Sequence, residues 1–235
     1  MELSPVEALK RRAAAQALEY VESGMVLGLG TGSTIAHFLD LLSEALAEGR
    51  LTDIVGIPTS IRTTREARQK RIELVGFAER DRIQLTVDGA DEVSPRLDLI
   101  KGMGGALLRE KMVAQASDRV VIIADESKAV DRLGTVSPLP IEVVEWGFGA
   151  HVRLLEGIGA DVSVRMMDEG HPYKTDNGNL VLDCRFPRGI PDARALENAL
   201  RARAGVVESG LFLDIADVAI LASPDGNRVL TRDDA

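Results

Sequence analysis

The chain has 235 residues, 45% of them hydrophobic, and a formal net charge of −9. This length suits one large domain, or a main domain that carries a smaller one. The acidic balance argues against a general nucleic-acid binder, which needs a basic face. No apolar run approaches the ~18 residues that span a membrane. A small anionic substrate stays possible, because a local cluster of N–H groups and lysines binds phosphate even on an acidic protein.

Cysteine usage and the N-terminus indicate a cytoplasmic protein. Cys184 is the only cysteine, which excludes an internal disulfide and metal sites built from two or four cysteines. Residues 1–12 lack the basic-then-apolar order of a signal peptide. His37, His151 and His171 have no partners at ligand spacing. We therefore expect neither a metal site nor a cofactor.

The first elements surround a glycine-rich turn. Apolar residues recur at helical spacing over residues 5–21, and residues 25–29 have the composition of a short buried strand. The sequence GLGTGST follows at residues 28–34, and a helix pattern covers residues 35–47. A strand, a glycine-rich turn and a helix start form an anion site, because glycines admit the anion and the first helical N–H groups are unpaired.

Two familiar versions of this anion site do not fit. A P-loop needs a lysine after its glycines, and none follows here. A dinucleotide site needs an acidic residue at the end of the second strand. That strand, over residues 54–57, is followed by Pro-Thr-Ser-Ile-Arg. The loop is therefore predicted to hold a single phosphate. A polar helix over residues 63–70 and a strand over residues 72–75 come next.

The segment over residues 82–116 is the most informative part of the chain. Its two apolar runs, residues 83–87 and 97–100, have strand composition, and each ends in a polar turn. A helix pattern begins near Ala106. Because sites in open α/β sheets lie at the carboxyl ends of the strands, we expect acid–base groups to converge there. These groups are Asp88, Asp91, Glu92, Lys101 and Glu110.

Glu110 lies on an apolar flank of the predicted helix. Its neighbours three and four residues away are Ala106, Leu107, Val113 and Ala114, none of which is basic. Burial would raise the pKa of this carboxyl into the range of a general base. A distant arginine or lysine partner is the alternative that the spacing leaves open.

The next strand ends close to a lysine. Residues 119–123 are predicted to form a strand, because the last four are β-branched and suited to the interior of a sheet, and Ala-Asp-Glu-Ser-Lys follows them. Lys128 is therefore placed at the same sheet edge as the glycine-rich loop. It is either a phosphate contact or an ordinary surface lysine.

The pattern of predicted secondary-structure elements changes near Pro138. Strands are predicted over residues 141–144, 161–166, 180–186 and 206–212, with helices over residues 148–156 and 192–204. Asp-Asn-Gly-Asn at residues 176–179 is a hairpin-turn signal. The order β-α-β-β-α-β is that of a ferredoxin-like unit. We predict an inserted α+β domain over residues 137–207 within a main domain of residues 1–136 and 208–235, whose sheet regains a strand at residues 218–222.

Four motifs together carry a resemblance to a known family. GLGTGST, VDGADE, KGMGGALLREK and the later DESK with DNGN resemble type A ribose-5-phosphate isomerase over essentially the whole chain. The resemblance implies an α/β fold with a Rossmann-like, mostly parallel sheet and an inserted small domain. It implies interconversion of ribose 5-phosphate and ribulose 5-phosphate in the pentose phosphate pathway. It also implies a cytosolic homo-oligomer, a dimer or a tetramer, that needs no metal.

The resemblance also implies roles for individual residues. Glu110 matches the proton-transferring glutamate, Lys128 matches the lysine at the phosphate, and Lys10 matches a further lysine nearby. Met103 departs from the usual glycine or polar residue, but it would contribute only its backbone. The remaining substrate-binding residues implied are Thr31, Gly32, Ser33, Thr34, Asp88, Gly89, Ala90, Asp91, Lys101, Gly102 and Gly104.

The chemistry of these residue types agrees with that implied reaction. Aldose–ketose isomerisation moves a proton between adjacent carbons through an enediolate, and Glu110 suits the base. Lys101 and glycine N–H groups suit the developing oxyanion. Asp88 or Asp91 can hold hydroxyls and help to open the furanose ring. Phosphate binding would orient the substrate.

Two other functions stay open on the sequence. A coenzyme A transferase of the same broad fold also uses a glutamate and glycine-rich loops, but it needs a thioester substrate. A sugar-phosphate sensor domain of a transcription regulator needs a DNA-binding helix-turn-helix, for which the residues before the first strand leave no room. Such a sensor would also have no use for Glu110.

Overall fold

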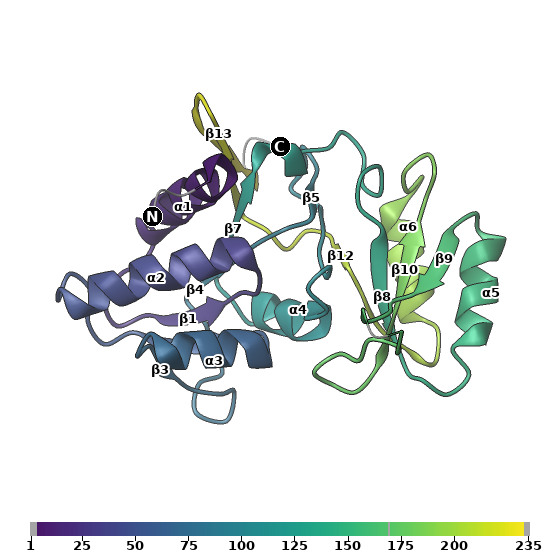
Figure 1. The fold of residues 1–235 in the computed structure, drawn as a ribbon, viewed down its shortest axis with the longest axis horizontal. Helices are drawn as coiled ribbons and strands as arrows, with labels where there is room; N and C mark the ends of the chain where they lie inside the picture. Colours follow the sequence, from purple (N-terminus) through teal and green to yellow (C-terminus); the bar gives the residue numbers. More distant parts are fainter. Residues whose placement is uncertain (1–3, 169, 233–235) are drawn as a thin grey trace.

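The structure is a computed structural model that describes residues 4–168 and 170–232. Residues 1–3 and 233–235, which belong to the predicted main domain, lie outside the described residues. Figure 1 shows a large sheet with helices α1–α4 on one side of the molecule and a smaller sheet with α5 and α6 on the other. Within the described residues, no helix is both long enough and apolar enough to cross a membrane.

The large sheet has seven strands in the order β14-β13-β7-β4-β1-β2-β3. All neighbours pair in parallel except β13 and β14. The six parallel strands, numbered along the chain, follow the Rossmann-like order 3-2-1-4-5-6, which reverses between β1 and β4. The strands are β1 (Val26–Leu29), β2 (Val55–Pro58), β3 (Glu73–Leu74), β4 (Leu85–Asp88), β7 (Val120–Asp125), β13 (Val218–Ser223) and β14 (Gly226–Thr231).

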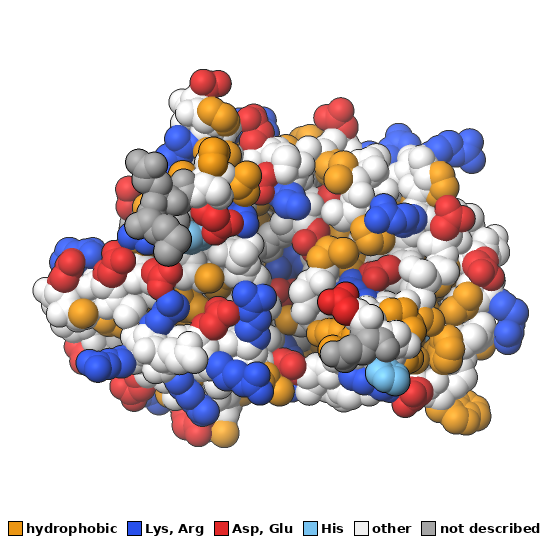
Figure 2. Space-filling view, in the orientation of Figure 1, with side chains coloured by type: hydrophobic (Ala, Val, Ile, Leu, Met, Phe, Trp, Pro, Cys, Tyr) orange, Lys and Arg blue, Asp and Glu red, His pale blue; other side chains and the backbone are white. Residues whose placement is uncertain are grey.

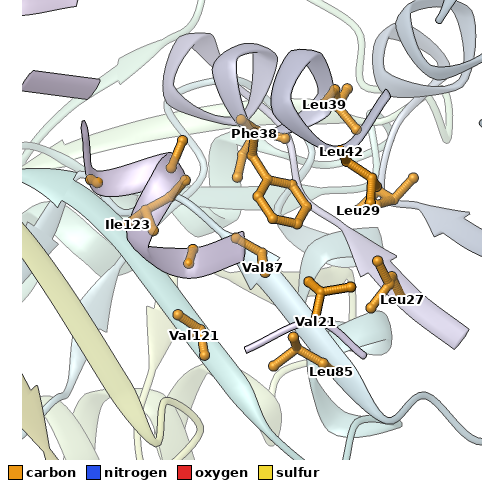
Figure 3. Close-up of a cluster of buried hydrophobic side chains, with 14 of the residues drawn as sticks. Val21, Leu27, Leu29, Phe38, Leu39, Leu42, Leu85, Val87, Val121 and Ile123 are labelled. Atoms are coloured by element: carbon orange, nitrogen blue, oxygen red, sulfur yellow. The ribbon is translucent and has the colours of Figure 1, made fainter. Parts of the chain in front are cut away.

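Alternate residues of these strands face two hydrophobic layers. Leu27 and Leu29 of β1 pack with Phe38 of α2 and with alanines of α1 (Figure 3). Val26 points to the opposite face and packs near Val113 of α4. Two-sided burial explains why the strands are continuously apolar rather than alternating. The helices are α1 (Pro5–Leu18), α2 (Ser33–Ala47), α3 (Ile61–Gln69) and α4 (Leu107–Gln115).

The smaller sheet is antiparallel and has the order β11-β8-β10-β9. In chain order this is 4-1-3-2, so the ferredoxin-like order predicted from the sequence is confirmed. Asp192, the first residue of the helix predicted over residues 192–204, caps the second helix of this unit by accepting a hydrogen bond from the N–H of Ala195. The division into domains at residues 137 and 207 stays a prediction. The elements are β8 (Leu139–Val143), α5 (Gly149–Gly157), β9 (Asp161–Val164), β10 (Leu180–Arg185), α6 (Ala193–Arg201) and β11 (Val206–Ser209).

The segment after β4 belongs to a third sheet, so the prediction that it joins the parallel sheet is wrong. The run at residues 97–100 does not join the parallel sheet; it forms β6 (Leu99–Ile100), which pairs antiparallel with β5 (Glu92–Val93) and β12 (Leu211–Phe212). A tight turn, in which the N–H of Leu97 donates to the carbonyl of Ser94, reverses the chain between β5 and β6. The single strand predicted at residues 206–212 is therefore two strands in different sheets. The edge strand β14 was not predicted.

Candidate active site

One cavity lies where β1, β4 and β7 end, at the point where the strand order reverses. Its volume is about 390 Å³, within the ~300–1,000 Å³ typical of small-molecule sites. It gathers nearly all the site residues predicted from the sequence. The lining residues are Val6, Lys10, Thr31, Gly32, Ser33, Thr34, Gly89, Ala90, Asp91, Lys101, Gly102, Gly104, Glu110, Asp125 and Lys128.

The glycine-rich turn lines this cavity beside two lysines. Ser33 is the first residue of α2, so the first N–H groups of the helix have no carbonyl partner within it. Lys10 of α1 donates to the hydroxyl of Ser33 over 2.9 Å, which places an ammonium at the helix N-terminus. Lys128 lines the same cavity from the short helical turn after β7. N–H groups, a hydroxyl and two ammonium groups are what a phosphate requires.

Asp88 supports the glycine-rich turn from beneath. Its carboxylate accepts hydrogen bonds from the N–H groups of Thr31 (3.1 Å) and Gly89 (2.7 Å). A Cβ at Gly30 would lie only 2.1 Å from Asp88 Oδ1, so a glycine is required there. Asp88 is 2% exposed and does not line the cavity. Asp91 does line it, and its carboxylate accepts the N–H of Met103 at 3.0 Å.

Lys101, Asp88 and Glu110 form a buried charged cluster. The ammonium of Lys101 lies 3.0 Å from Asp88 Oδ2 and 3.3 Å from Glu110 Oε1, and it donates to the carbonyl of Gly89 at 2.6 Å. The distant basic partner that the spacing left open for Glu110 is therefore Lys101. The second oxygen, Glu110 Oε2, is buried and has no hydrogen-bond partner among the described residues. Because a buried carboxylate normally satisfies both oxygens, this oxygen is available to a ligand.

Burial controls the protonation of this cluster. It raises the pKa of Glu110 to about 8, with Asp88 and Asp91 adding to the rise and Lys101 opposing it. Burial also raises the pKa of Asp88, against the stabilisation by Lys101 and two N–H donors. Burial alone would lower the pKa of Lys101, but the surrounding carboxylates raise it above its ordinary value. Asp88 accepts two backbone N–H donors that Glu110 lacks, and such donors favour the charged form of a carboxyl.

A network of hydroxyl groups, not predicted from the sequence, holds the glycine-rich turn. The hydroxyl of Thr31 lies 2.8 Å from that of Thr59, 2.9 Å from that of Ser60 and 3.0 Å from that of Thr63. Thr63 in turn donates to the carbonyl of Gly30 at 2.8 Å. The available signal was the Thr-Ser pair directly after the second strand, at the carboxyl edge of the sheet.

Three other residues lie outside the predicted chemistry. Glu92 was expected among the site carboxylates, but it is fully buried and accepts the N–H groups of residues 134, 136 and 137. Met103 is 44% exposed and does not line the cavity; it contributes its N–H to Asp91. His37 lies 2.6 Å from Glu7, which also binds Lys10 at 2.6 Å. Across residues 4–168 and 170–232, no group of three or more His, Cys, Asp or Glu side chains is arranged to hold a metal.

Comparisons with known proteins identify the family. Residues 55–226 match the profile of ribose 5-phosphate isomerase A (phosphoriboisomerase A). A ribose-5-phosphate isomerase A of Desulfatibacillum aliphaticivorans is 52% identical over 94% of this chain and 96% of that protein. A solved D-ribose-5-phosphate isomerase in complex with phospho-erythronic acid superposes with a TM-score of 0.94 at 41% identity, covering 97% of this chain and all of that one. The isomerase of Plasmodium falciparum gives 0.93 at 38% identity, covering 96% and 98%. This chain therefore belongs to the ribose 5-phosphate isomerase A family and is an isomerase.

Proposed function

We propose that this enzyme interconverts ribose 5-phosphate and ribulose 5-phosphate through an enediolate, with Glu110 as the base. The observation that carries the proposal is the free oxygen of Glu110. Oε1 lies 3.3 Å from Lys101, whereas Oε2 is buried without a partner among the described residues, and the side chain lines the cavity. A desolvated carboxyl with a pKa of about 8 is suited to taking up and releasing a proton near neutral pH.

The proton transfer uses one carboxyl twice. In the open-chain aldose, the Glu110 carboxylate removes the proton from C2, and the electron pair of that C–H bond forms the C1–C2 double bond of the enediolate. The protonated Glu110 then returns the proton to C1, while the hydroxyl proton of O2 passes to O1. The products are a C2 ketone and a C1 alcohol, so the reaction needs no external oxidant or reductant.

Lys101 and Asp91 are assigned to the oxygens of the sugar. The buried ammonium of Lys101 stabilises the negative charge that develops when the enediolate forms, and it is already oriented by Asp88 and the carbonyl of Gly89. Asp91 lines the cavity and Asp88 does not, which favours Asp91 for the contact with sugar hydroxyls and for ring opening. Asp88 would then orient Lys101 and the glycine-rich turn.

The other end of the cavity anchors the phosphate. Ser33 and Thr34 at the start of α2, together with Lys10 and Lys128, supply the donors and positive charge. Binding energy from this remote group fixes the position of C1 and C2 against Glu110. The solved relative in complex with phospho-erythronic acid, a phosphorylated sugar acid, supports a ligand of this class.

The comparisons favour this activity over the alternatives raised by the sequence. Relatives that span nearly the whole chain carry isomerase names, so neither a coenzyme A transferase nor a transcriptional sensor domain is the better description. As the resemblance implies, we also propose a cytoplasmic homo-oligomer, a dimer or a tetramer. Light scattering of the purified protein would measure the assembly, and a monomer at micromolar concentration would contradict this part.

The direct test is turnover in heavy water. We expect the purified enzyme to convert ribose 5-phosphate into ribulose 5-phosphate and to introduce deuterium at the carbons that exchange the proton, as followed by NMR. A coenzyme A thioester offered with an acyl acceptor should give no transfer. A correctly folded protein that neither isomerises ribose 5-phosphate nor exchanges its C2 proton would overturn the proposal.

A further inference from the structure

The connection between β9 and β10 reaches from the smaller sheet to the elements that build the cavity (Figure 1). Its last part, residues 173–179, contacts α3, α4 and the loop between β6 and α4. The turn signal Asp-Asn-Gly-Asn lies in this segment, and the proposed reaction assigns it no role. Several residues of the segment make polar contacts with these elements. Because hydrogen bonds are directional, the contacts fix the position of the segment more closely than apolar packing would.

Arg109 of α4 makes the central contact with this segment. Its Nε donates to Asn177 Oδ1 at 3.0 Å, and its Nη2 donates to the carbonyl of Asp176 at 2.9 Å. Its Nη1 lies 3.5 Å from the carboxylate of Asp176. Three nitrogens of one guanidinium therefore bind two successive residues, a geometry that lysine cannot reproduce. Arg109 directly precedes Glu110 in the chain.

Asp176 links the same segment to α3. Its Oδ2 accepts the N–H of Ile61, the first residue of that helix, at 2.7 Å. The neighbouring Ser60 and Thr63 belong to the hydroxyl network around Thr31. One carboxylate thus connects α4, which carries Glu110, with the helix whose first turn holds the glycine-rich loop.

A buried carboxylate fixes the segment to its own sheet. Glu142 of β8 is fully buried, and its Oε1 accepts hydrogen bonds from Thr175 (2.9 Å), Asn177 (3.1 Å) and Asn179 (2.8 Å). The three donors alternate along the segment, so Asp176 faces away from Glu142 and towards the cavity elements. The smaller sheet therefore provides a rigid base for the contact.

The same connection covers the loop that follows Lys101. Arg165 donates to the carbonyls of Gly102 and Met103, each at 3.0 Å. The hydroxyl of Tyr173 lies 2.2 Å from where a Cβ of Gly105 would be, so any larger residue there would displace the ring. The segments that carry Lys101 and Glu110 are thus both held by residues of the connection between β9 and β10.

We propose that Arg109 and Asp176 are positioning residues, which fix α4 so that Glu110 stays aligned with Lys101 and with the substrate carbon. The inference rests on the proposed role of Glu110. Glu110 needs such support because, among residues 4–168 and 170–232, its carboxyl is held by Lys101 alone, at 3.3 Å from Oε1, and Oε2 has no partner. A base displaced by an ångström can lose about a hundredfold in rate.

The test compares Arg109→Met, Arg109→Lys, Asp176→Ala and Asp176→Asn with a matched control. The control is Lys174→Ala, since Lys174 lies in the same segment but pairs with the exposed Glu145, at 2.8 Å, and not with α3 or α4. We expect Arg109→Met and Asp176→Ala to lower kcat about ten- to a hundredfold with KM nearly unchanged. Arg109→Lys and Asp176→Asn, which keep part of the contact, should retain more activity. Lys174→Ala should match the wild type.

The double variant Arg109→Met/Asp176→Ala supplies the readout that a general loss of stability would not give. Because both substitutions weaken the same contact between α4 and residues 173–179, the loss in kcat of the double variant should be smaller than the product of the two single losses. Three results would each overturn the proposal. They are losses in kcat that multiply in the double variant, changes confined to KM, and wild-type kcat in folded Arg109→Lys and Asp176→Asn. If Glu110→Gln kept its activity, the base assignment itself would fail. An inactive Glu110→Gln beside fully active Arg109 and Asp176 variants would refute only the positioning role.

Discussion

The carboxyl of Glu110 and the ammonium of Lys101 lie 3.3 Å apart, and each side chain is about 95% buried (5% and 4% exposed). Glu110 comes from α4, which packs on the large parallel sheet, and Lys101 directly follows β6 of the three-stranded third sheet. A buried pair of this kind adds little net stability, because desolvation offsets most of its attraction. The arrangement is therefore best explained by the chemistry assigned to it.

We predict that Glu110→Gln abolishes isomerisation while substrate still binds. Glutamine keeps the volume and one acceptor, but it cannot take the C2 proton, and a positioned base contributes ~10²–10⁴-fold. Calorimetry should give a near-normal dissociation constant for ribose 5-phosphate, and NMR in heavy water should show no exchange. A variant that kept more than about a tenth of the wild-type rate, far short of that contribution, would refute the assignment and make Asp91 the next candidate.

The stability of the fold should depend on pH through Glu110. Its pKa is 4.5 without the fold's influence and about 8 within it. Between these values the folded state binds more protons than the unfolded state, so stability falls as the pH rises. The contribution of protonated Glu110 to the stability of the fold is fully present below pH 4.5 and is lost as the pH rises through about 8.

Glu110→Gln removes this titration and serves as the control. Urea unfolding of both proteins should show that the variant gains stability relative to the wild type between about pH 5 and about pH 9. A difference that does not change with pH would contradict the raised pKa of this carboxyl.

The phosphate end should affect binding more than chemistry. We expect Ser33→Ala, Lys10→Ala and Lys128→Ala to raise KM for ribose 5-phosphate, because each removes a donor that lines the cavity. Residual turnover of unphosphorylated ribose should change far less, since ribose cannot use those donors. Equal losses on the two substrates would instead place these residues in the chemical step.

Activity should not depend on a metal. The expectation comes from the reaction, in which Glu110 and Lys101 provide the base and the positive charge. Exhaustive dialysis against EDTA should leave kcat unchanged when ribose 5-phosphate turnover is assayed in metal-free buffer. A loss that a divalent cation restores would show that a metal shares the stabilisation of the enediolate.

The local parts of the site could be predicted from the sequence. The glycine-rich turn is recognised because strand, glycines and helix start are consecutive, and Lys128 because it closely follows a strand of the main sheet. The burial of Glu110 followed from its apolar helical neighbours, and the structure confirms it, with 4% of the residue exposed. Charged side chains of both signs are mixed over the face shown in Figure 2.

The non-local parts could not be predicted. The strand before Lys101 was assigned to the parallel sheet, because its composition shows that it is buried but not which strand it pairs with. Its partner β12 lies more than a hundred residues further along the chain. For the same reason, Glu92 was expected in the site, although its partners are N–H groups of residues 134–137. The contact between Arg109 and Asp176 also joins distant segments.

The pairing of β6 with β12 makes the site depend on the order in which the chain is synthesised. Leu99 and Ile100 pair with Phe212 and Leu211, and the N–H of Lys101 donates to the carbonyl of Gly210 at 2.9 Å. A nascent chain that has left the ribosome only as far as β11 carries Glu110 and Lys101 but lacks the strand that positions the lysine. The interior strand β13 also comes after that point. Catalytic competence should therefore appear late and abruptly during translation, as the last strands enter two sheets at once.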